Sequence, residues 1–140
     1  MRSLLLFSFL LLLGGCSDRK QPNVIVVTLD TTRADRLGAY GYEGASTPTM
    51  DRLAESGFVF ERHTVPVPIT LPSHTSLFTG LYPPQHGVRD NGAFVADGRL
   101  LTLAEAFAAH GYQTGAAVGS FPVTRRFGLD QGFHFYDDDF

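Results

Sequence analysis

Three apolar stretches of the chain have the pattern of β-strands. Residues 24–29 read Val-Ile-Val-Val-Thr-Leu without a charged position, bounded by Asn23 and Asp30. An unbroken β-branched run of this length predicts a strand buried on both faces of a parallel sheet. Residues 58–63 and 113–118 predict two further, shorter strands.

Helical signals lie between these strands. Pro48 follows a potential cap at Thr47 and predicts a helix that ends before Gly57. A second helix is predicted over residues 71–79, with Pro72 in its first turn and Gly80 after its end. A third begins at the capping box formed by Thr102 and Glu105 and ends at Gly111. The intervening residues 82–98 are rich in Pro, Gly and Asn-Gly and predict a loop.

Alternating strands and helices indicate an α/β fold with a mostly parallel sheet. In such folds ligands bind outside the carboxyl ends of the strands, which makes the residues just after each strand candidates for chemistry. The composition of the 140 residues, with 44% hydrophobic and 18% charged, is that of one globular domain. A net charge of -3 without a basic run argues against nucleic acid as a partner.

The N-terminus predicts export. Arg2 precedes an apolar run of about ten residues, which is too short to span a bilayer as a helix and is typical of a signal peptide. Gly14 and Gly15 precede Cys16, the single cysteine, in the manner of a bacterial lipobox. We therefore expect residues 1–15 to be a lipoprotein signal peptide, Cys16 to carry a lipid, and residues 16–22 to form a polar tether. A plain secretory signal with an incidental cysteine is the alternative.

Two residues stand where a phosphate or sulfate ester could react. Asp30 directly follows the first predicted strand, so its carboxylate could hold a metal ion, or it could simply cap a turn. Thr70 precedes a predicted helix start, where backbone N–H groups and the helix dipole favour an oxyanion. Its hydroxyl is a weak nucleophile unless a cation or base activates it, and without one Thr70 would only be an N-cap.

Three other polar residues are candidates with structural alternatives. His74 and His86 could be ligands, oxyanion donors or hydrogen-bonded structural histidines. Asn91 could donate to a developing oxyanion, although Asn-Gly is also an ordinary turn dipeptide. Glu105 is explained by its capping box, and the acidic run at 137–139 by an exposed turn.

Taken together, several segments resemble the N-terminal part of a sulfatase-like hydrolase of the alkaline phosphatase superfamily. The segments are PNVIVVTLDTTRADRLG at 22–38, TPTMD at 47–51, TLPSH at 70–74 and TGLYP at 79–83. The resemblance implies the α/β sandwich of that superfamily, with residues 23–140 as the N-terminal part of the domain. It also implies further metal ligands in a distal half, so we expect a truncated domain that is inactive alone.

The sequence departs from sulfatases proper at two positions. The family motif Cys/Ser-x-Pro-x-Arg begins with the residue that is oxidised to formylglycine, whereas this chain has Thr70 there and His74 in place of the arginine. The family also has two successive aspartates after the first strand, and here the second is Thr31. Thr-x-Pro-x-His is similar to the nucleophile region of the nucleotide pyrophosphatase/phosphodiesterase branch, in which the threonine itself attacks.

The resemblance therefore implies a metal-dependent hydrolase of sulfate or phosphate esters, with Thr70 favouring phosphate esters or diesters. Thr70 would be the nucleophile, Asp30 and the Thr70 oxygen would share a divalent metal, zinc or calcium, and Asn91 would hold a non-bridging oxygen. The expected setting is the bacterial cell surface or periplasm, with a lipid anchor in the membrane. A non-catalytic surface lipoprotein that keeps the fold is the alternative, and a transferase to a membrane acceptor is a less supported third.

Overall fold

The computed structural model describes residues 21–140. Its helices are α1 (Pro48–Ser56), α2 (Thr70–Thr79), α3 (Pro83–His86) and α4 (Leu103–Ala109). Its strands are β1 (Gly115–Ala117) and β2 (Phe135–Asp137), and four short 3-10 turns complete the elements. The predicted signal peptide and Cys16 lie outside the described residues. No helix within residues 21–140 is both long enough and apolar enough to cross a membrane.

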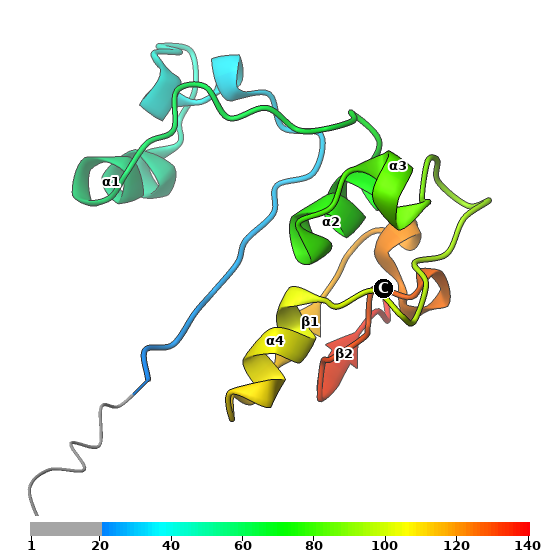
Figure 1. Cartoon of the computed structure of the whole chain (residues 1–140). Helices are drawn as coiled ribbons and strands as arrows, with labels where there is room; N and C mark the ends of the chain where they lie inside the picture. The colour runs from blue at the N-terminus through cyan, green and yellow to red at the C-terminus, as the bar shows by residue number, and fades with distance from the viewer. Residues whose placement is uncertain (1–20) are drawn as a thin grey trace, which may run out of the picture.

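The two strands form a parallel sheet. Gly115 pairs with Phe135, and Ala117 with Asp137. The connection between them passes through two 3-10 turns, Phe121–Val123 and Arg125–Phe127. Figure 1 shows α2, α3, α4 and the sheet gathered in one group, with α1 to one side. Helices beside a parallel sheet agree with the predicted α/β class, and β1 lies within the strand predicted at 113–118.

Residues 24–29 are extended but are not a strand in this structure, contrary to the prediction. A strand exists only where its backbone pairs with a neighbour, and none of the described residues pairs with this segment. Its apolar side chains are consequently exposed, Ile25 by 84%. Residues 58–63 are likewise outside any strand, with Phe58 exposed by 95%. In both segments the sequence carries the strand pattern without a pairing partner among residues 21–140.

The predicted helices are present, with changes at their ends. Helix α2 includes Thr70 as its first residue, and the cap position is Ile69, so Thr70 is not the N-cap. The helix ends at Gly80, whose φ of 69° continues the chain in the left-handed region. Thr47 makes no capping bond to α1, because its hydroxyl oxygen accepts the Gly38 N–H at 3.0 Å while its proton is donated to Asp51. The predicted loop 82–98 contains the short helix α3.

The core is small and lies against α2. Leu71 and Val88 are almost completely buried, and they form one cluster with Phe127 and Leu129. The cluster is completed by the smaller residues Ala96 and Val123. Because Leu71 is the second residue of α2, the packing of this cluster fixes where the helix begins.

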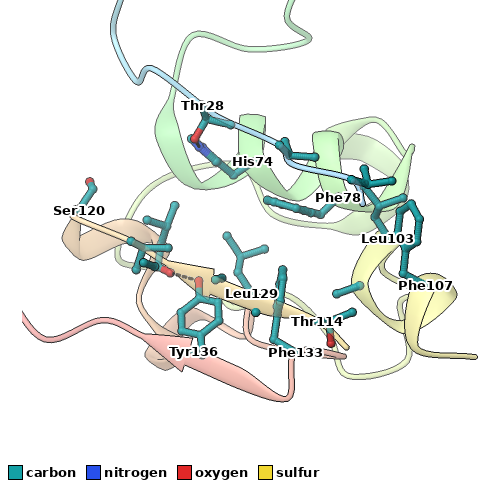
Figure 2. Close-up of a pocket in the computed structure, with 18 of the residues that line it drawn as sticks. Thr28, His74, Phe78, Leu103, Phe107, Thr114, Ser120, Leu129, Phe133 and Tyr136 are labelled. Atoms are coloured by element: carbon teal, nitrogen blue, oxygen red, sulfur yellow. Dashed lines mark hydrogen bonds between the residues drawn. The ribbon is translucent and has the colours of Figure 1, made fainter. Parts of the chain in front are cut away.

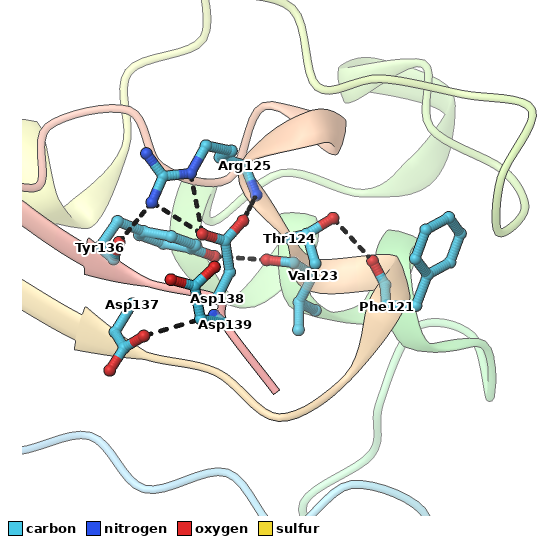
Figure 3. A network of polar contacts seen from close by, with 8 residues as sticks. All are labelled: Phe121, Val123, Thr124, Arg125, Tyr136, Asp137, Asp138 and Asp139. Atoms are coloured by element: carbon cyan, nitrogen blue, oxygen red, sulfur yellow. Dashed lines mark hydrogen bonds and ion pairs between the residues drawn. The ribbon is translucent and has the colours of Figure 1, made fainter.

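The acidic run at 137–139 is partly structural, in contrast to the exposed turn that was expected. Figure 3 shows the Arg125 guanidinium bonded to the Asp138 carboxylate, with a shortest distance of 2.7 Å, and to the carbonyl of Tyr136. This hydrogen bonding holds the pKa of the Asp138 carboxyl below its usual range. The Tyr136 hydroxyl donates to the Val123 carbonyl, and burial raises the pKa of Tyr136 to about 12. These bonds fasten β2 to the 3-10 turns that precede it.

The predicted capping box starts α4. The Glu105 N–H donates to the Thr102 hydroxyl at 3.1 Å, and the Thr102 N–H donates to the Glu105 carboxylate at 2.8 Å. The Thr102 hydroxyl also donates to the Gln131 carbonyl at 3.0 Å. The adjoining Gly132 approaches this helix start so closely that a Cβ atom there would overlap the backbone of Glu105. The capping box therefore also docks the turn that leads into β2.

Two glycines allow this close approach to be tested. Gly111 and Gly132 both have φ of 83°, but only Gly132 has neighbours within 4 Å of an added Cβ. Gly111→Ala should cost about 1–2 kcal/mol for the left-handed backbone alone. Gly132→Ala should cost about 1–3 kcal/mol more, because the helix start must shift. Denaturant unfolding of both variants measures the difference, and equal losses would contradict the docking role of Gly132.

Candidate active site at the start of helix α2

Asp30 and Thr70 lie together although forty positions separate them in the sequence. The Thr70 hydroxyl donates to the Asp30 carboxylate, with 3.0 Å between Oγ1 and Oδ2. Asp30 is exposed and Thr70 is half-buried. Asp30 follows the extended segment 24–29, and Thr70 lies in the first turn of α2. The family resemblance implied that these two residues share a metal ion, and their side chains are neighbours although the segment before Asp30 is not a strand.

A strained turn orients the Asp30 carboxylate toward α2. The Thr32 N–H donates to the Leu29 carbonyl at 3.2 Å, which closes a tight turn around Asp30 and Thr31. Thr31 has φ of 57°, the positive φ of a β-branched residue, which is uncommon and costs about 1–3 kcal/mol. The Thr31 N–H donates to the other carboxylate oxygen of Asp30 at 3.0 Å. The turn therefore orients one oxygen of Asp30 and leaves the other for Thr70.

His74 links the helix to the extended segment. Its Nδ1 lies 2.8 Å from the Thr70 carbonyl and its Nε2 lies 3.2 Å from the Thr28 hydroxyl. A carbonyl can only accept, so Nδ1 carries a proton and donates to Thr70. Thr28 was not singled out in the sequence, although it lies two residues before Asp30 and so on the same face of an extended chain. The contacts of His74 give it a positioning role, and a direct role in catalysis stays a prediction.

The backbone donors at the start of α2 are mostly in use. The Leu71 N–H donates to the Asn91 side-chain oxygen at 2.8 Å. Pro72 has no N–H, and the Ser73 N–H donates to the Ile69 carbonyl at 3.0 Å. Within the described chain this leaves the Thr70 N–H without a partner. Of the backbone N–H groups expected to bind an oxyanion, only that of Thr70 is therefore available, together with the helix dipole.

Asn91 serves this helix start as a cap supplied by a distant residue. Its Oδ1 accepts from Leu71, and its amide group has no partner within residues 21–140. The predicted role of Asn91 as a donor to an ester oxygen is untested, but the residue does lie beside Thr70 as expected. Of the five candidates, Asp30, Thr70, His74 and Asn91 are brought together, whereas His86 is buried elsewhere, bonded to Ser76.

An open cleft of about 950 Å³ lies over this group. Its lining includes Asp30, Thr70, His74 and Asn91. A second cavity of about 480 Å³ shares Asp30, Thr70 and His74 with the first and extends between segment 24–28 and β1. Figure 2 shows Thr28 and His74 at one side of this second cavity, with the apolar Phe78, Leu103 and Phe107 beyond them. The first cleft contains all four candidate residues, Asn91 included, and is therefore the candidate binding site for an ester.

The described residues supply only part of a metal site. The Asp30 carboxylate and the Thr70 hydroxyl are two oxygen donors at hydrogen-bond distance, which fits two neighbouring ligands of one cation. Residues 21–140 contain no group of three or more His, Cys, Asp or Glu side chains arranged to hold a metal ion. A complete site would therefore need additional ligands.

Comparison with known proteins matches residues 22–137 to a family model described as Sulfatase. Human arylsulfatase A is 35% identical over 143 aligned residues, which cover 95% of this chain and 27% of the human protein. N-acetylgalactosamine-6-O-sulfatase from Bacteroides thetaiotaomicron is 32% identical over 117 residues, 74% of this chain and 23% of that protein. The chain thus spans about a quarter of the length of these relatives.

A solved structure supports the same relationship. A crystal structure of a protein assigned to the sulfatases, from Bacteroides thetaiotaomicron, superposes with a TM-score of 0.63 and 28% identity. The match covers 73% of this chain and 22% of that one. The resemblance seen in the sequence motifs is confirmed, as is the α/β fold.

Proposed function

This chain belongs to the sulfatase family, and we propose that its Thr70 is the nucleophile of a metal-dependent hydrolase of phosphate or sulfate esters. The observation that carries the proposal is the hydrogen bond from the Thr70 hydroxyl to the Asp30 carboxylate. A hydroxyl held by a carboxylate at the start of a helix has the orientation that attack on a tetrahedral ester requires.

In this reaction Thr70 Oγ1 attacks the phosphorus or sulfur atom, and the bond from that atom to the departing alcohol breaks. Asp30 accepts the hydroxyl proton, and the departing alkoxide takes up a proton from water. Water then hydrolyses the ester formed on Thr70. The Thr70 N–H and the amide group of Asn91 donate to the non-bridging oxygens, where negative charge develops.

A divalent cation, zinc or calcium, would be held in part by Asp30 and the Thr70 oxygen. When bound it would lower the pKa of the attacking hydroxyl, which the negative charge of a carboxylate cannot do. His74 keeps the two ligands aligned, since its ring joins Thr70 to the segment that carries Asp30.

Threonine at position 70 favours phosphate esters over sulfate esters as substrates. A threonine side chain cannot be converted to the formylglycine aldehyde on which sulfatases proper depend, and direct attack by an alkoxide is the established chemistry of phosphate ester hydrolysis in the related branch. The relatives named above are sulfatases by name, so sulfate esters remain the second substrate class to be assayed.

The nucleophile is tested by Thr70→Ala and Thr70→Ser in the full-length protein, with 4-nitrophenyl phosphate, bis(4-nitrophenyl) phosphate and 4-nitrophenyl sulfate as probes. Loss of the hydroxyl should lower kcat by roughly a thousandfold or more. Serine restores the hydroxyl and should keep kcat within about tenfold of wild type. An active Thr70→Ala enzyme would remove the assignment, and activity on the sulfate alone would reverse the substrate preference.

The metal ligand is tested by Asp30→Asn, with metal per chain measured by mass spectrometry after dialysis. The expected result is a lower metal content, because a neutral amide is a weaker ligand than a carboxylate. Asp35→Asn is the matched control, since Asp35 lies in the same loop but pairs with Arg33 at 2.6 Å. A wild-type protein without bound metal would favour the alternative of a non-catalytic lipoprotein that keeps the fold.

The proposed location is the bacterial membrane, through a lipid on Cys16, with the hydrolase domain exported. The support is the lipobox-like sequence before the single cysteine. Labelled palmitate should be incorporated into the wild-type protein in a bacterial host and not into Cys16→Ser. Labelling that survives the substitution would contradict the anchor.

A further inference from the structure

A buried histidine outside the cleft holds the segment that carries Asn91. His86, the last residue of α3, is 5% exposed, and Ser76 in the middle of α2 is 6% exposed. His86 Nε2 lies 3.0 Å from the Ser76 hydroxyl oxygen. His86 Nδ1 accepts the Val88 N–H at 3.1 Å. Both ring nitrogens are therefore in use.

These contacts determine the protonation state of the ring. The Val88 N–H can only donate, so Nδ1 must be unprotonated, and Nε2 carries the single proton and donates to Ser76. His86 is thus neutral in the folded structure. A second proton would turn Nδ1 from an acceptor into a donor facing another donor, and would leave a charge in a buried site.

Among residues 21–140 the ring bonds only to Ser76 and Val88, so no acidic group is bonded to it to compensate such a charge. Helix α2 contains no Asp, Glu, Lys or Arg, and its titratable side chain, His74, is bonded to Thr70 and Thr28. In the segment after α3, neither Arg89 nor Asp90 is bonded to the ring. Burial alone lowers the pKa of His86 from its usual 6.5.

The segment from 86 to 91 is attached to α2 at both of its ends. His86 bonds to Ser76, and Asn91 accepts from Leu71 at 2.8 Å. Between them the Val88 side chain is 1% exposed and belongs to the same buried cluster as Leu71. Release of the His86 end would thus loosen the segment that places Asn91 beside Thr70.

We propose that His86 is a positioning residue and an acid-sensitive latch, whose protonation releases residues 86–91 from α2 and withdraws Asn91 from the active site. The effect on catalysis rests on the proposed function of Thr70, whereas the release itself does not. The folded state disfavours the protonated ring, which lowers the pKa of His86 below the 6.5 of the unfolded chain. The closed segment therefore has its full stability at pH values above 6.5 and loses stability as the pH falls below that value.

Hydrogen exchange detected by mass spectrometry tests the release in the full-length protein. After correction for the intrinsic dependence of exchange on pH, protection of peptides covering residues 82–92 should fall by up to about tenfold per pH unit below 6.5. His86→Asn retains an acceptor for the Val88 N–H and does not titrate, so its protection should be independent of pH. Unchanged protection in the wild type between pH 7 and pH 5 would overturn the latch.

Kinetics with 4-nitrophenyl phosphate test the positioning role. The wild type should lose kcat as pH falls below 6.5, and His86→Asn should lack this loss while having a lower kcat at neutral pH. His110→Asn is the matched control, because His110 is exposed and bonds through Nδ1 to the Ala106 carbonyl in α4. The positioning role fails if His86→Asn keeps the wild-type pH profile, or if His110→Asn abolishes the acid loss equally.

The two proposals fail in different ways. An active Thr70→Ala enzyme would remove the proposed nucleophile, but the exchange measurement would still decide whether His86 releases the segment. If His86→Asn does not fold, the wild-type exchange profile and Ser76→Ala remain. Ser76→Ala removes one anchor of the ring and should lower the protection of residues 82–92 at neutral pH, and unchanged protection would contradict the latch.

Discussion

The burial of Leu71 is the constraint on which the candidate site depends. This side chain is fully buried at the second position of α2, so the helix cannot slide or rotate without opening the core. Thr70, one residue earlier, is thereby fixed at the rim of the cleft. The N–H of the same Leu71 is bonded to Asn91, so packing and hydrogen bonding at one residue place both the candidate nucleophile and its neighbouring amide.

The helices were predictable because their signals are local. The capping box of Thr102 and Glu105 and the glycine that follows α2 act within a few residues, and the structure reproduces them. The short helix α3 lies in the predicted loop 82–98 and was not predicted. The approach of Asp30 to Thr70 was implied by the family resemblance, in which the two residues share a metal ion, and the structure places their side chains 3.0 Å apart. The contact of Thr28 with His74 and the acceptance of the Leu71 N–H by the side-chain oxygen of Asn91 were not predictable, because each joins distant segments.

The strand predicted at 24–29, which is not formed among the described residues, shows the limit of a local pattern. Its sequence has the composition of a central strand, but pairing requires neighbours, and the described residues contribute only β1 and β2, which pair with each other. The cavity between this segment and β1 is lined by alternate residues, Val24, Val26 and Thr28, as one face of a strand would line it. The sequence pattern thus predicts a strand with paired neighbours, and the described residues 21–140 provide a partner surface on one side but no pairing strand.

The strained backbone at Thr31 affects which substitutions this position favours. A glycine at that position would adopt the same conformation without a steric penalty, so selection for stability alone would favour it. The threonine instead keeps the turn stiff and so restricts the orientations open to the Asp30 carboxylate. Stability and a fixed orientation of the Asp30 carboxylate therefore place opposite demands on this one residue.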